Sequence, residues 1–481
     1  MTEKLKQLAE ETSVLEMDVE GRKKLQNKAL SYSERFFDSL STNDAYKPFN
    51  SSLYSLLDDP IMETGEPAEQ IIHEIEHRIM EPGLNVPSGR NFGYIPGSSL
   101  VSAAIGDYLA AVTNRYASVY TSSPGAVLLE IRLIRWLADL VGYGKNAGGY
   151  LASGGSNANL TAVVTARDSA GLTAEDFPNT VIYLTGQTHH CVDRALNIAG
   201  LKQCRRRYVE MDNQFRMKPE KLSELILDDK KKGLIPMMIV ASAGSTDTGA
   251  IDPMEEIGEI ARMHKIWFHV DAAYGGFFAL TEGGRQKLMG IEKSDSVVLD
   301  PHKGLFLPYG IGALIVKDEQ KLADSHSYAA NYMQDSLANR PFYSPADVSP
   351  ELSKHFRALR MWLPLKLHGV KAFRSALEEK MLLARYLWEQ FREIEEIETG
   401  PLPQLSIFMF RWVPKTGDAN EMNRKLHQKL LEGGRVFLST TQVNGAFFLR
   451  VAVLSVRTHL EEANELLDQI NQQISDIKKS S

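Results

Sequence analysis

The stretch that decides the fold reads HVDAAYGG at residues 269–276 and DPHKGLF at residues 300–306. Each segment follows a short apolar run, IWFHV in the first case and SVVL in the second, that is typical of a β-strand ending in a turn. Ligands of open α/β sheets bind at the carboxyl ends of the strands. We therefore expect Asp271 and Lys303 to face the same crevice.

A carboxylate and an amine at one sheet edge suit pyridoxal phosphate. The amine forms a Schiff base with the cofactor, and the carboxylate keeps the pyridine nitrogen protonated so that the ring accepts electrons. Taken singly, Asp271 would suit a helix cap and Lys303 a surface loop. The pair, with strand context and the adjacent His302, favours the cofactor.

Composition places the chain among ordinary globular proteins. It has 481 residues, 24% of them charged and 43% hydrophobic, with a formal net charge of -7. This charge argues against a nucleic-acid partner, and we find no signal-peptide core and no apolar run of membrane-spanning length. Two cysteines, Cys191 and Cys204, give no disulfide framework. We expect a cytoplasmic protein of two or three domains.

Hydrophobic patterning divides the chain into three parts, at residues 1–90, 91–350 and 351–481. The first part looks helical and is expected to serve dimerisation, with helices at 3–15, 19–40 and 67–80. The second alternates strands and helices, which predicts a mainly parallel sheet with helices on both faces. Its seven expected strands are 149–152, 181–185, 206–210, 237–241, 267–270, 297–299 and 312–316. The third part reads as a small α+β domain with helices at 351–367, 420–431 and 460–477 and strands at 405–412 and 447–453.

Three further segments follow predicted strands. ASGGSNAN (152–159) opens a helix with small residues, so a phosphate or a plain capped turn would fit it equally. QTHH (187–190) offers an imidazole that would stack on a cofactor or transfer a proton, although either histidine alone also suits a cap. AGSTDTGAID (243–252) suits a hydrogen bond to a cofactor or an ordinary turn.

One motif points to a different chemistry. Residues 73–77 read HEIEH, which fits the H-E-x-x-H pattern of zinc peptidases on a predicted helix. His73 and His77 would share one helix face, but the following sequence has no evident third ligand. We therefore expect no metal, and a zinc peptidase stays the distant alternative.

The assembled motifs resemble the group II pyridoxal-phosphate-dependent amino-acid decarboxylases, the family of aromatic-amino-acid and glutamate decarboxylases. The resemblance runs from about Gly89 into the C-terminal part, through NFGYIPG, SPGAVLLE, ASGGSNAN, QTHHCVDRA, GSTDTGAID, HVDAAYGG, DPHKGLF and SKHFRALRMW in that order. It implies a fold type I pyridoxal enzyme that forms a homodimer with its active sites at the subunit interface.

The resemblance also implies individual roles. Lys303 would carry the cofactor beside His302, Asp271 would bind its ring nitrogen, and Ala273 and His189 would cover the two ring faces. The remaining implied contacts are Gly155 and Ser156 for the phosphate, Thr246 for the ring or phosphate, and Phe92, Tyr94 and Tyr120 for the substrate. These assignments predict catalysis by Lys303, His189 and Asp271.

The family carries a loop tyrosine that protonates the substrate carbon. Between the lysine and FRALRMW, Tyr343 lies nearest the expected position, offset by about two residues, and Tyr332 is the second candidate. A hydroxyl at this place delivers a proton and yields an amine. Without it, dioxygen would intercept the carbanion and yield an aldehyde.

The expected function is the decarboxylation of an amino acid to an amine and carbon dioxide. Aromatic residues in the expected pocket favour an aromatic substrate. An acidic substrate needs one arginine, and Arg90 or Arg115 would supply it. A pyridoxal-dependent aldehyde synthase or aminotransferase is the other alternative, because it would use the same cofactor residues.

Overall fold

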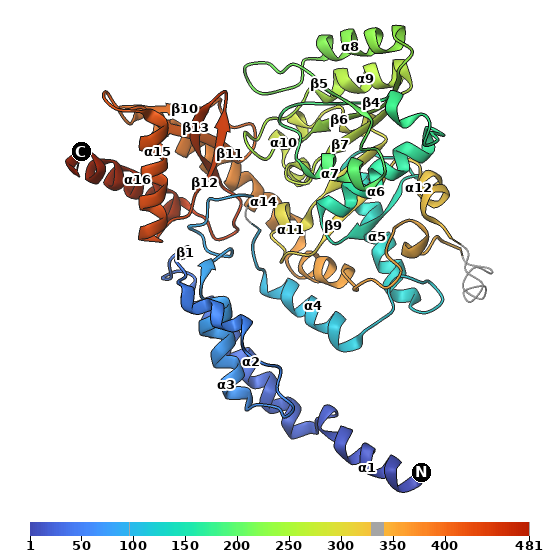
Figure 1. Cartoon of the computed structure of the whole chain (residues 1–481), viewed down its shortest axis with the longest axis vertical. Helices are drawn as coiled ribbons and strands as arrows, with labels where there is room; N and C mark the ends of the chain where they lie inside the picture. The colour runs from blue at the N-terminus through green and yellow to red at the C-terminus, as the bar shows by residue number, and fades with distance from the viewer. Residues whose placement is uncertain (96, 329–340, 481) are drawn as a thin grey trace.

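The structure is a computed structural model that describes residues 1–95, 97–328 and 341–480. A helical N-terminal arm, a large α/β domain and a small C-terminal domain follow one another along the chain (Figure 1). No helix of the described ranges is long and apolar enough to cross a bilayer.

The large domain is built on a seven-stranded sheet. In spatial order its strands are β3 (Gly148–Ala152), β9 (Gly312–Val316), β8 (Ser296–Leu299), β7 (Trp267–Asp271), β6 (Ile235–Ser242), β4 (Thr180–Leu184) and β5 (Arg205–Tyr208). Only β9 pairs antiparallel with its neighbours, so the other six strands run in one direction. All seven strands expected from the sequence are confirmed, as is the mainly parallel sheet.

Alternating side chains of the strands form two separate apolar clusters, one on each face of the sheet. Phe268 and Val270 of β7 belong to the first cluster and Trp267 to the second. The first cluster also takes apolar side chains from α4 (Val101–Thr113), α5 (Pro124–Leu140), α8 (Pro219–Lys231), α9 (Met254–His264) and α14 (Ala358–Glu393). The second takes them from α6 (Gly155–Ser169), α7 (Cys191–Ile198) and α12 (Glu319–His326). Both faces are therefore covered, as buried parallel strands require.

The C-terminal domain packs a four-stranded antiparallel sheet against helices. Its strand order is β10 (Ile397–Thr399), β11 (Ile407–Trp412), β13 (Ala446–Ala452) and β12 (Ser439–Val443), with α15 (Ala419–Gly433) and α16 (Leu460–Ser480) beside it. The two longer expected strands are present, and β10 and β12 are additions. Two glycines near residue 90 lie in close contact with this domain. A Cβ atom placed on Gly89 would lie 2.3 Å from the Arg457 carbonyl oxygen, and one placed on Gly93 would lie 2.2 Å from the Phe437 ring. The segment around residue 90 thus packs on the C-terminal domain.

Helix α14 differs from the expected helix at 351–367. It begins at Ala358, because the preceding residues make buried polar contacts instead of helical turns. It also continues to Glu393 through a break at Gly369, where φ is 69° and ψ is 156°. The predicted end therefore lies close to this break, which glycine permits because it has no Cβ.

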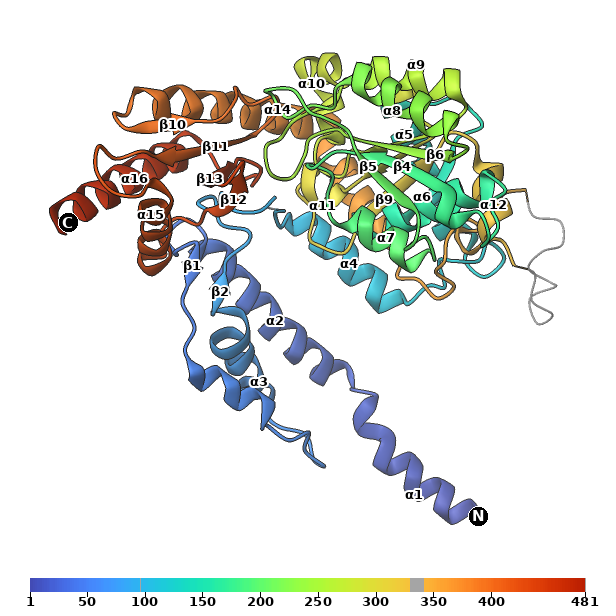
Figure 2. The same ribbon diagram turned by 45° about the horizontal axis from the view of Figure 1, so that its top comes forward.

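The N-terminal arm projects from the body of the molecule (Figures 1 and 2). It contains α1 (Thr2–Thr12), α2 (Val19–Ser39) and α3 (Ala68–Glu74), with a π-helical turn at Ile75–Met80 and a short pair of strands, β1 (Tyr46–Lys47) and β2 (Gly83–Leu84). None of these helices has a buried residue. The three expected helices are confirmed, but little of their apolar surface is covered within one chain.

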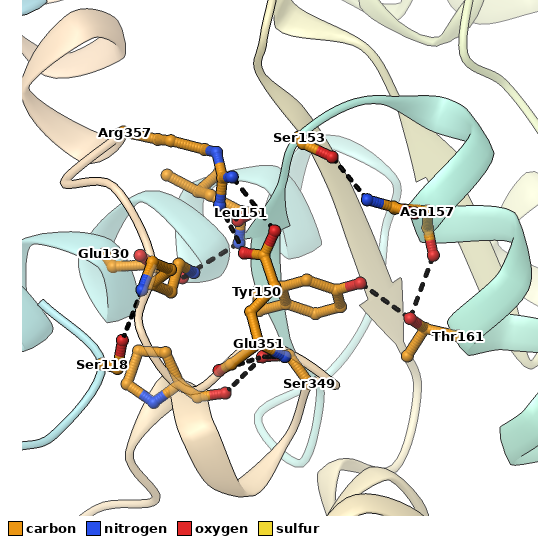
Figure 3. A network of polar contacts seen from close by, with 12 residues as sticks. Ser118, Glu130, Tyr150, Leu151, Ser153, Asn157, Thr161, Ser349, Glu351 and Arg357 are labelled. Carbon is orange, nitrogen blue, oxygen red and sulfur yellow. Dashed lines mark hydrogen bonds and ion pairs between the residues drawn. The ribbon is translucent and has the colours of Figure 1, made fainter.

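A buried ion pair ties the edge strand β3 to the segment before α14. The Lys354 Nζ lies 2.6 Å from the Glu130 Oε1, and both side chains are almost fully buried. Glu130 also accepts a hydrogen bond from the Leu151 backbone, while Arg357 donates one to the Leu151 carbonyl oxygen (Figure 3). These contacts position β3 and therefore the glycine-rich turn that follows it.

Removing one partner of this pair would leave a buried charge without its counterion. We expect Lys354→Met to lower the free energy of unfolding by about 3–5 kcal/mol. Adding Glu130→Gln removes the stranded charge but keeps an acceptor for Leu151, so the double variant should recover much of the loss. Thermal and denaturant unfolding of the three proteins would measure this. Equal destabilisation of single and double variants would contradict the assignment.

Candidate active site

A cavity of about 340 Å³ opens at the carboxyl ends of the parallel strands. It is lined by Ser153, Gly154, Gly155, Ser156, Asn157, Asn159, Gln187, His189, Cys191, Ser242, Gly244, Ser245, Thr246, Asp271, Ala273, Tyr274, Asp300, His302 and Lys303. All eight residues expected to bind the cofactor are among them. Five strand ends, those of β3, β4, β6, β7 and β8, deliver them, as open α/β sheets predict.

Among the described residues that line this cavity, Lys303 is the one lysine or arginine. It lies on the short helix α11 (Pro301–Gly304), and its Nζ is 3.0 Å from the Asp300 Oδ2. Burial lowers the pKa of the Lys303 ammonium, but Asp300 and Asp271 outweigh burial and raise this pKa above its ordinary value. In the cofactor-free protein the amine is therefore held protonated.

His302 closes the cavity beside this lysine. Its Nδ1 contacts the Ile311 carbonyl oxygen, and its Nε2 lies 3.6 Å from the Asp300 Oδ2. Burial lowers the pKa of His302, so the ring is neutral at neutral pH. A neutral imidazole bonded to a carbonyl carries its proton on Nδ1. The Nε2 is then an acceptor.

Asp271 and His189 flank the centre of the cavity. The Asp271 carboxylate accepts hydrogen bonds from the Asn159 Nδ2 at 3.2 Å and from the Ala273 N–H at 3.1 Å. The Cys191 N–H donates to the His189 Nδ1 at 3.3 Å. Burial lowers the pKa of His189 and Asp271 only partly opposes this, so a flat neutral imidazole faces the site.

The turn before α6 leaves no room for larger side chains. A Cβ on Gly155 would lie 2.8 Å from the Asp300 Oδ2 and 3.4 Å from the Ala273 Cβ. Gly154 has a φ of 157°, which favours glycine. Helix α6 begins at Gly155, so its first N–H groups and the Ser156 hydroxyl are donors suited to an anion.

The donor set of the cavity fits pyridoxal phosphate. A helix N-terminus suits its phosphate, an amine its aldehyde carbon, and a carboxylate its ring nitrogen. In addition, the Asp300 Oδ1 is buried and has no hydrogen-bond partner within the described ranges. This oxygen is shielded from the cavity, whereas the Oδ2 is the oxygen that pairs with Lys303.

The C-terminal domain contributes a buried arginine to the rim of the cavity. The Arg450 guanidinium donates hydrogen bonds to the carbonyl oxygens of Thr246, Asp247 and Tyr94. Thr246 is thus held at the cavity by its backbone, and Tyr94 lies beside it with 61% of its surface exposed. Tyr94 is placed near the cavity but does not line it.

Two expected substrate contacts lie elsewhere. The expected substrate contact of Phe92 is corrected by the structure. The Phe92 side chain is fully buried in the core of the C-terminal domain, because its backbone pairs with Phe437 and Ala452 and turns the ring inward. It cannot line the cavity in this conformation. The Tyr120 N–H donates to the Ser344 hydroxyl, and its ring centroid lies 6.4 Å from that of Phe342, outside the cavity wall.

Tyr343 also lies outside the cavity of its own chain. Its hydroxyl donates a 2.8 Å hydrogen bond to the Gln320 Oε1 on α12, and its ring packs on the second apolar cluster. Tyr332, the second candidate, lies outside the described residues. No contact of Tyr343 with Lys303 or Asp271 is present, so its catalytic role stays a prediction.

The H-E-x-x-H segment lies on the N-terminal arm. The His73 and His77 rings are 4.4 Å apart between centroids, and the His77 Nδ1 lies 3.6 Å from the Glu81 Oε2. Across residues 1–95, 97–328 and 341–480, no group of three or more histidine, cysteine, aspartate and glutamate side chains forms a potential metal site. The geometry therefore lends the zinc alternative no support.

Sequence reasoning did not single out Asn159 and Asp300. Asn159 lies one helical turn after Gly155 and thus on the same face of α6, which the period of the helix would have indicated. Asp300 precedes Lys303 by three residues, so a short helix after β8 brings the two side chains together. Both signals were present in the motifs already quoted.

Comparison with known proteins agrees with this geometry. Residues 51–412 match the family described as the pyridoxal-dependent decarboxylase conserved domain. An aromatic-L-amino-acid decarboxylase of Bacillus atrophaeus is 32% identical over 423 residues, covering 87% of this chain and 88% of the relative. A phenylacetaldehyde synthase of Petunia hybrida is 31% identical, covering 83% of each chain.

The fold is also found in a solved enzyme structure. The crystal structure of Catharanthus roseus tryptophan decarboxylase in complex with L-tryptophan superposes with a TM-score of 0.89 at 26% identity. The superposition covers 96% of this chain and 99% of the other.

The ion pair with Asp300 predicts how Lys303 responds to pH. Asp300→Asn removes a negative charge 3.0 Å from the amine, so the pKa of Lys303 should fall and more neutral amine should exist at a given pH. The pH profile for capture of pyridoxal phosphate by cofactor-free protein should then move to lower pH by about one unit. Stopped-flow absorbance would record it.

Asp229→Asn is the matched control for this experiment. Asp229 is a buried carboxylate that pairs with Arg207 and does not line the cavity. Its replacement should leave the pH profile unchanged. An unshifted profile for Asp300→Asn would mean that another group holds the proton on Lys303.

Proposed function

The chain belongs to the pyridoxal-dependent decarboxylase family, and we propose that it converts an aromatic L-amino acid to the corresponding amine and carbon dioxide. It is a pyridoxal-phosphate-dependent amino-acid decarboxylase with the fold of that family. One observation supports this function most directly. Asp271 at the end of β7 and Lys303 just after the neighbouring strand β8 line the same cavity.

The residues of the cavity have distinct tasks. When bound, pyridoxal phosphate supplies an electron sink for the pair of electrons left by carbon dioxide. Lys303 would hold the cofactor, and Asp271 would keep a proton on the ring nitrogen. The neutral imidazole of His189 and the methyl group of Ala273 would confine the ring and exclude water. The α6 N-terminus would hold the phosphate.

Three observations support an aromatic rather than an acidic substrate. The bacterial relative is an aromatic-L-amino-acid decarboxylase. Arg90, one of the two arginines considered for an acidic side chain, is buried and paired with Glu465. Near the cavity, the Tyr309 ring lies 5.5 Å from His302 and is 56% exposed, which leaves an aromatic surface free for a substrate ring.

Carbon dioxide release across the amino acids tests this proposal. We expect kcat/KM for at least one of tyrosine, tryptophan, phenylalanine or a hydroxylated analogue to exceed that for glutamate and aspartate by about tenfold or more. Borohydride reduction followed by peptide mapping should place the pyridoxyl group on Lys303. An adduct on another lysine, or faster release from glutamate, would contradict the proposal.

The second candidate function is aldehyde synthesis, which the petunia relative favours. In that reaction dioxygen and water are consumed, and ammonia and hydrogen peroxide accompany the aldehyde and carbon dioxide. The choice depends on whether an acid protonates the reacting carbon. We propose Tyr343 as this acid, which requires its hydroxyl to leave Gln320.

Tyr343→Phe should separate the two outcomes. Loss of a general acid should lower amine formation by about a hundredfold. Substrate would still be consumed, and aldehyde and hydrogen peroxide would form under air. Gln320→Leu is the control, because it removes the same hydrogen bond and keeps the hydroxyl. Unchanged amine formation by Tyr343→Phe, or equal effects of both variants, would identify Tyr343 as a loop anchor.

We also propose that the enzyme is a homodimer whose N-terminal arm packs on a second copy. The arm exposes the apolar side chains Leu5, Leu8, Val14, Leu15, Val19, Leu25 and Leu30. Helix α4 exposes Ile105, Tyr108, Leu109 and Val112 beside it. Apolar surface on helices without a core of their own is typical of an interface.

Light scattering of the purified enzyme tests the dimer. We expect a particle of twice the 53.7 kDa chain mass. Leu25→Lys with Leu30→Lys should produce monomers, whereas Leu382→Lys on α14, which is also exposed but lies outside the arm, should not. An active monomer of the unmodified chain would contradict the proposal.

A cytoplasmic location is proposed from the cysteines. Cys191 and Cys204 are both buried free thiols. Burial raises the pKa of the Cys204 thiol to about 11 and raises that of Cys191 as well, so both are unreactive. Unpaired thiols without a disulfide framework are typical of a reducing compartment.

A further inference from the structure

Behind Asp271, a row of polar side chains crosses an otherwise apolar layer. Residues 267, 269 and 271 alternate along β7, so Trp267, His269 and Asp271 point to the same face of the sheet. Helix α6 covers this face. His269 is 1% exposed and does not line the cavity, and nothing in the proposed reaction uses it.

These side chains form one continuous set of hydrogen bonds. The Trp267 Nε1 lies 2.9 Å from the Ser296 Oγ, which lies 2.7 Å from the His269 Nδ1. The His269 Nε2 lies 2.8 Å from the Asn159 Oδ1, and the Asn159 Nδ2 donates to the Asp271 Oδ2 at 3.2 Å. Each of the intermediate residues is buried. We call this set the relay.

The chemistry of the two ends and the burial of His269 together fix the direction of the bonds. The Trp267 indole N–H can only donate, so the Ser296 oxygen accepts from it. The Asp271 carboxylate can only accept, so Asn159 presents its amide N–H to it and its oxygen to His269. His269 then donates from Nε2 to Asn159, and because burial keeps the ring neutral, its Nδ1 accepts from the Ser296 hydroxyl.

The environment of His269 agrees with this state. Burial lowers the pKa of His269 to about 4, and Asp271 opposes the shift only in part. At any pH well above this value the ring is uncharged. The relay therefore brings hydrogen-bond donors to Asp271 without placing a second charge beside it.

We propose that Asn159 and His269 are positioning residues that hold the Asp271 carboxylate oriented toward the cofactor ring; this rests on the proposed function. A donor to one carboxylate oxygen makes that carboxylate a weaker base. The proton shared between Asp271 and the ring nitrogen then stays on the nitrogen. The second oxygen of Asp271 accepts from the Ala273 N–H, so both oxygens are held.

Paired substitutions test the relay. His269→Gln keeps an N–H donor for the Asn159 side chain, whereas His269→Leu has none. Asn159→Asp keeps the shape of the side chain at position 159 but replaces the N–H donor to Asp271 by an acceptor. We expect His269→Leu and Asn159→Asp to lower kcat by about tenfold or more, the effect of one hydrogen bond to a charged group. His269→Gln should retain most of the parent rate.

A spectroscopic readout separates positioning from packing. In enzyme loaded with pyridoxal phosphate labelled at the ring nitrogen, the ¹⁵N shift should move toward the unprotonated value in His269→Leu and Asn159→Asp. Affinity for the cofactor should fall with it. Tyr150→Phe is the control, because it removes a buried hydrogen bond between β3 and Thr161 of α6, with no contact to the relay.

Each outcome supports or overturns the relay. Parent-like ¹⁵N shifts in both variants, or the same shift in Tyr150→Phe, would overturn it. Should the variants fail to fold, ¹⁵N NMR of the unmodified enzyme decides, because His269 protonated on Nδ1 or on both nitrogens is incompatible with the relay. Failure of the unmodified enzyme to bind pyridoxal phosphate would instead overturn the proposed function.

Discussion

The parallel pairing of β7 with β8 is the constraint on which the active site depends. The Asp271 residue of β7 pairs with Val298 of β8, so both strands end at the same edge of the sheet. The backbone pairing continues past the strand ends, where the Asp300 N–H donates to the Ala273 carbonyl oxygen. Because the segments that follow β7 and β8 stay paired where they leave the sheet, a carboxylate and an amine from different strands line one cavity.

The ionisable side chains discussed for this cavity are one amine, two carboxyl groups and two imidazoles. Lys303 is buried against Asp300 and Asp271, and neutral imidazoles from His189 and His302 add no further charge. A pocket with a buried, paired ammonium is suited to a ligand that takes the amine.

The cavity is completed by parts of the chain that are distant in sequence. Arg450 from the C-terminal sheet holds the backbone of Thr246, and the Lys354–Glu130 pair holds β3 and the glycine turn after it. The arm and α4 leave apolar surface exposed on the outside.

The sequence by itself determined the seven strands, the mainly parallel sheet and eight of the nineteen described residues that line the cavity. It could do so because strand endings and short motifs are local, and parallel strands bring such endings to one edge. Only the tertiary structure decided the places of Phe92, Tyr120 and Tyr343. These aromatic side chains lie in segments whose direction is set by long-range packing, with Phe92 drawn into the C-terminal core by its pairing with Phe437. The relay likewise needed three elements, β7, β8 and α6, to meet, and no spacing along the chain specifies that meeting.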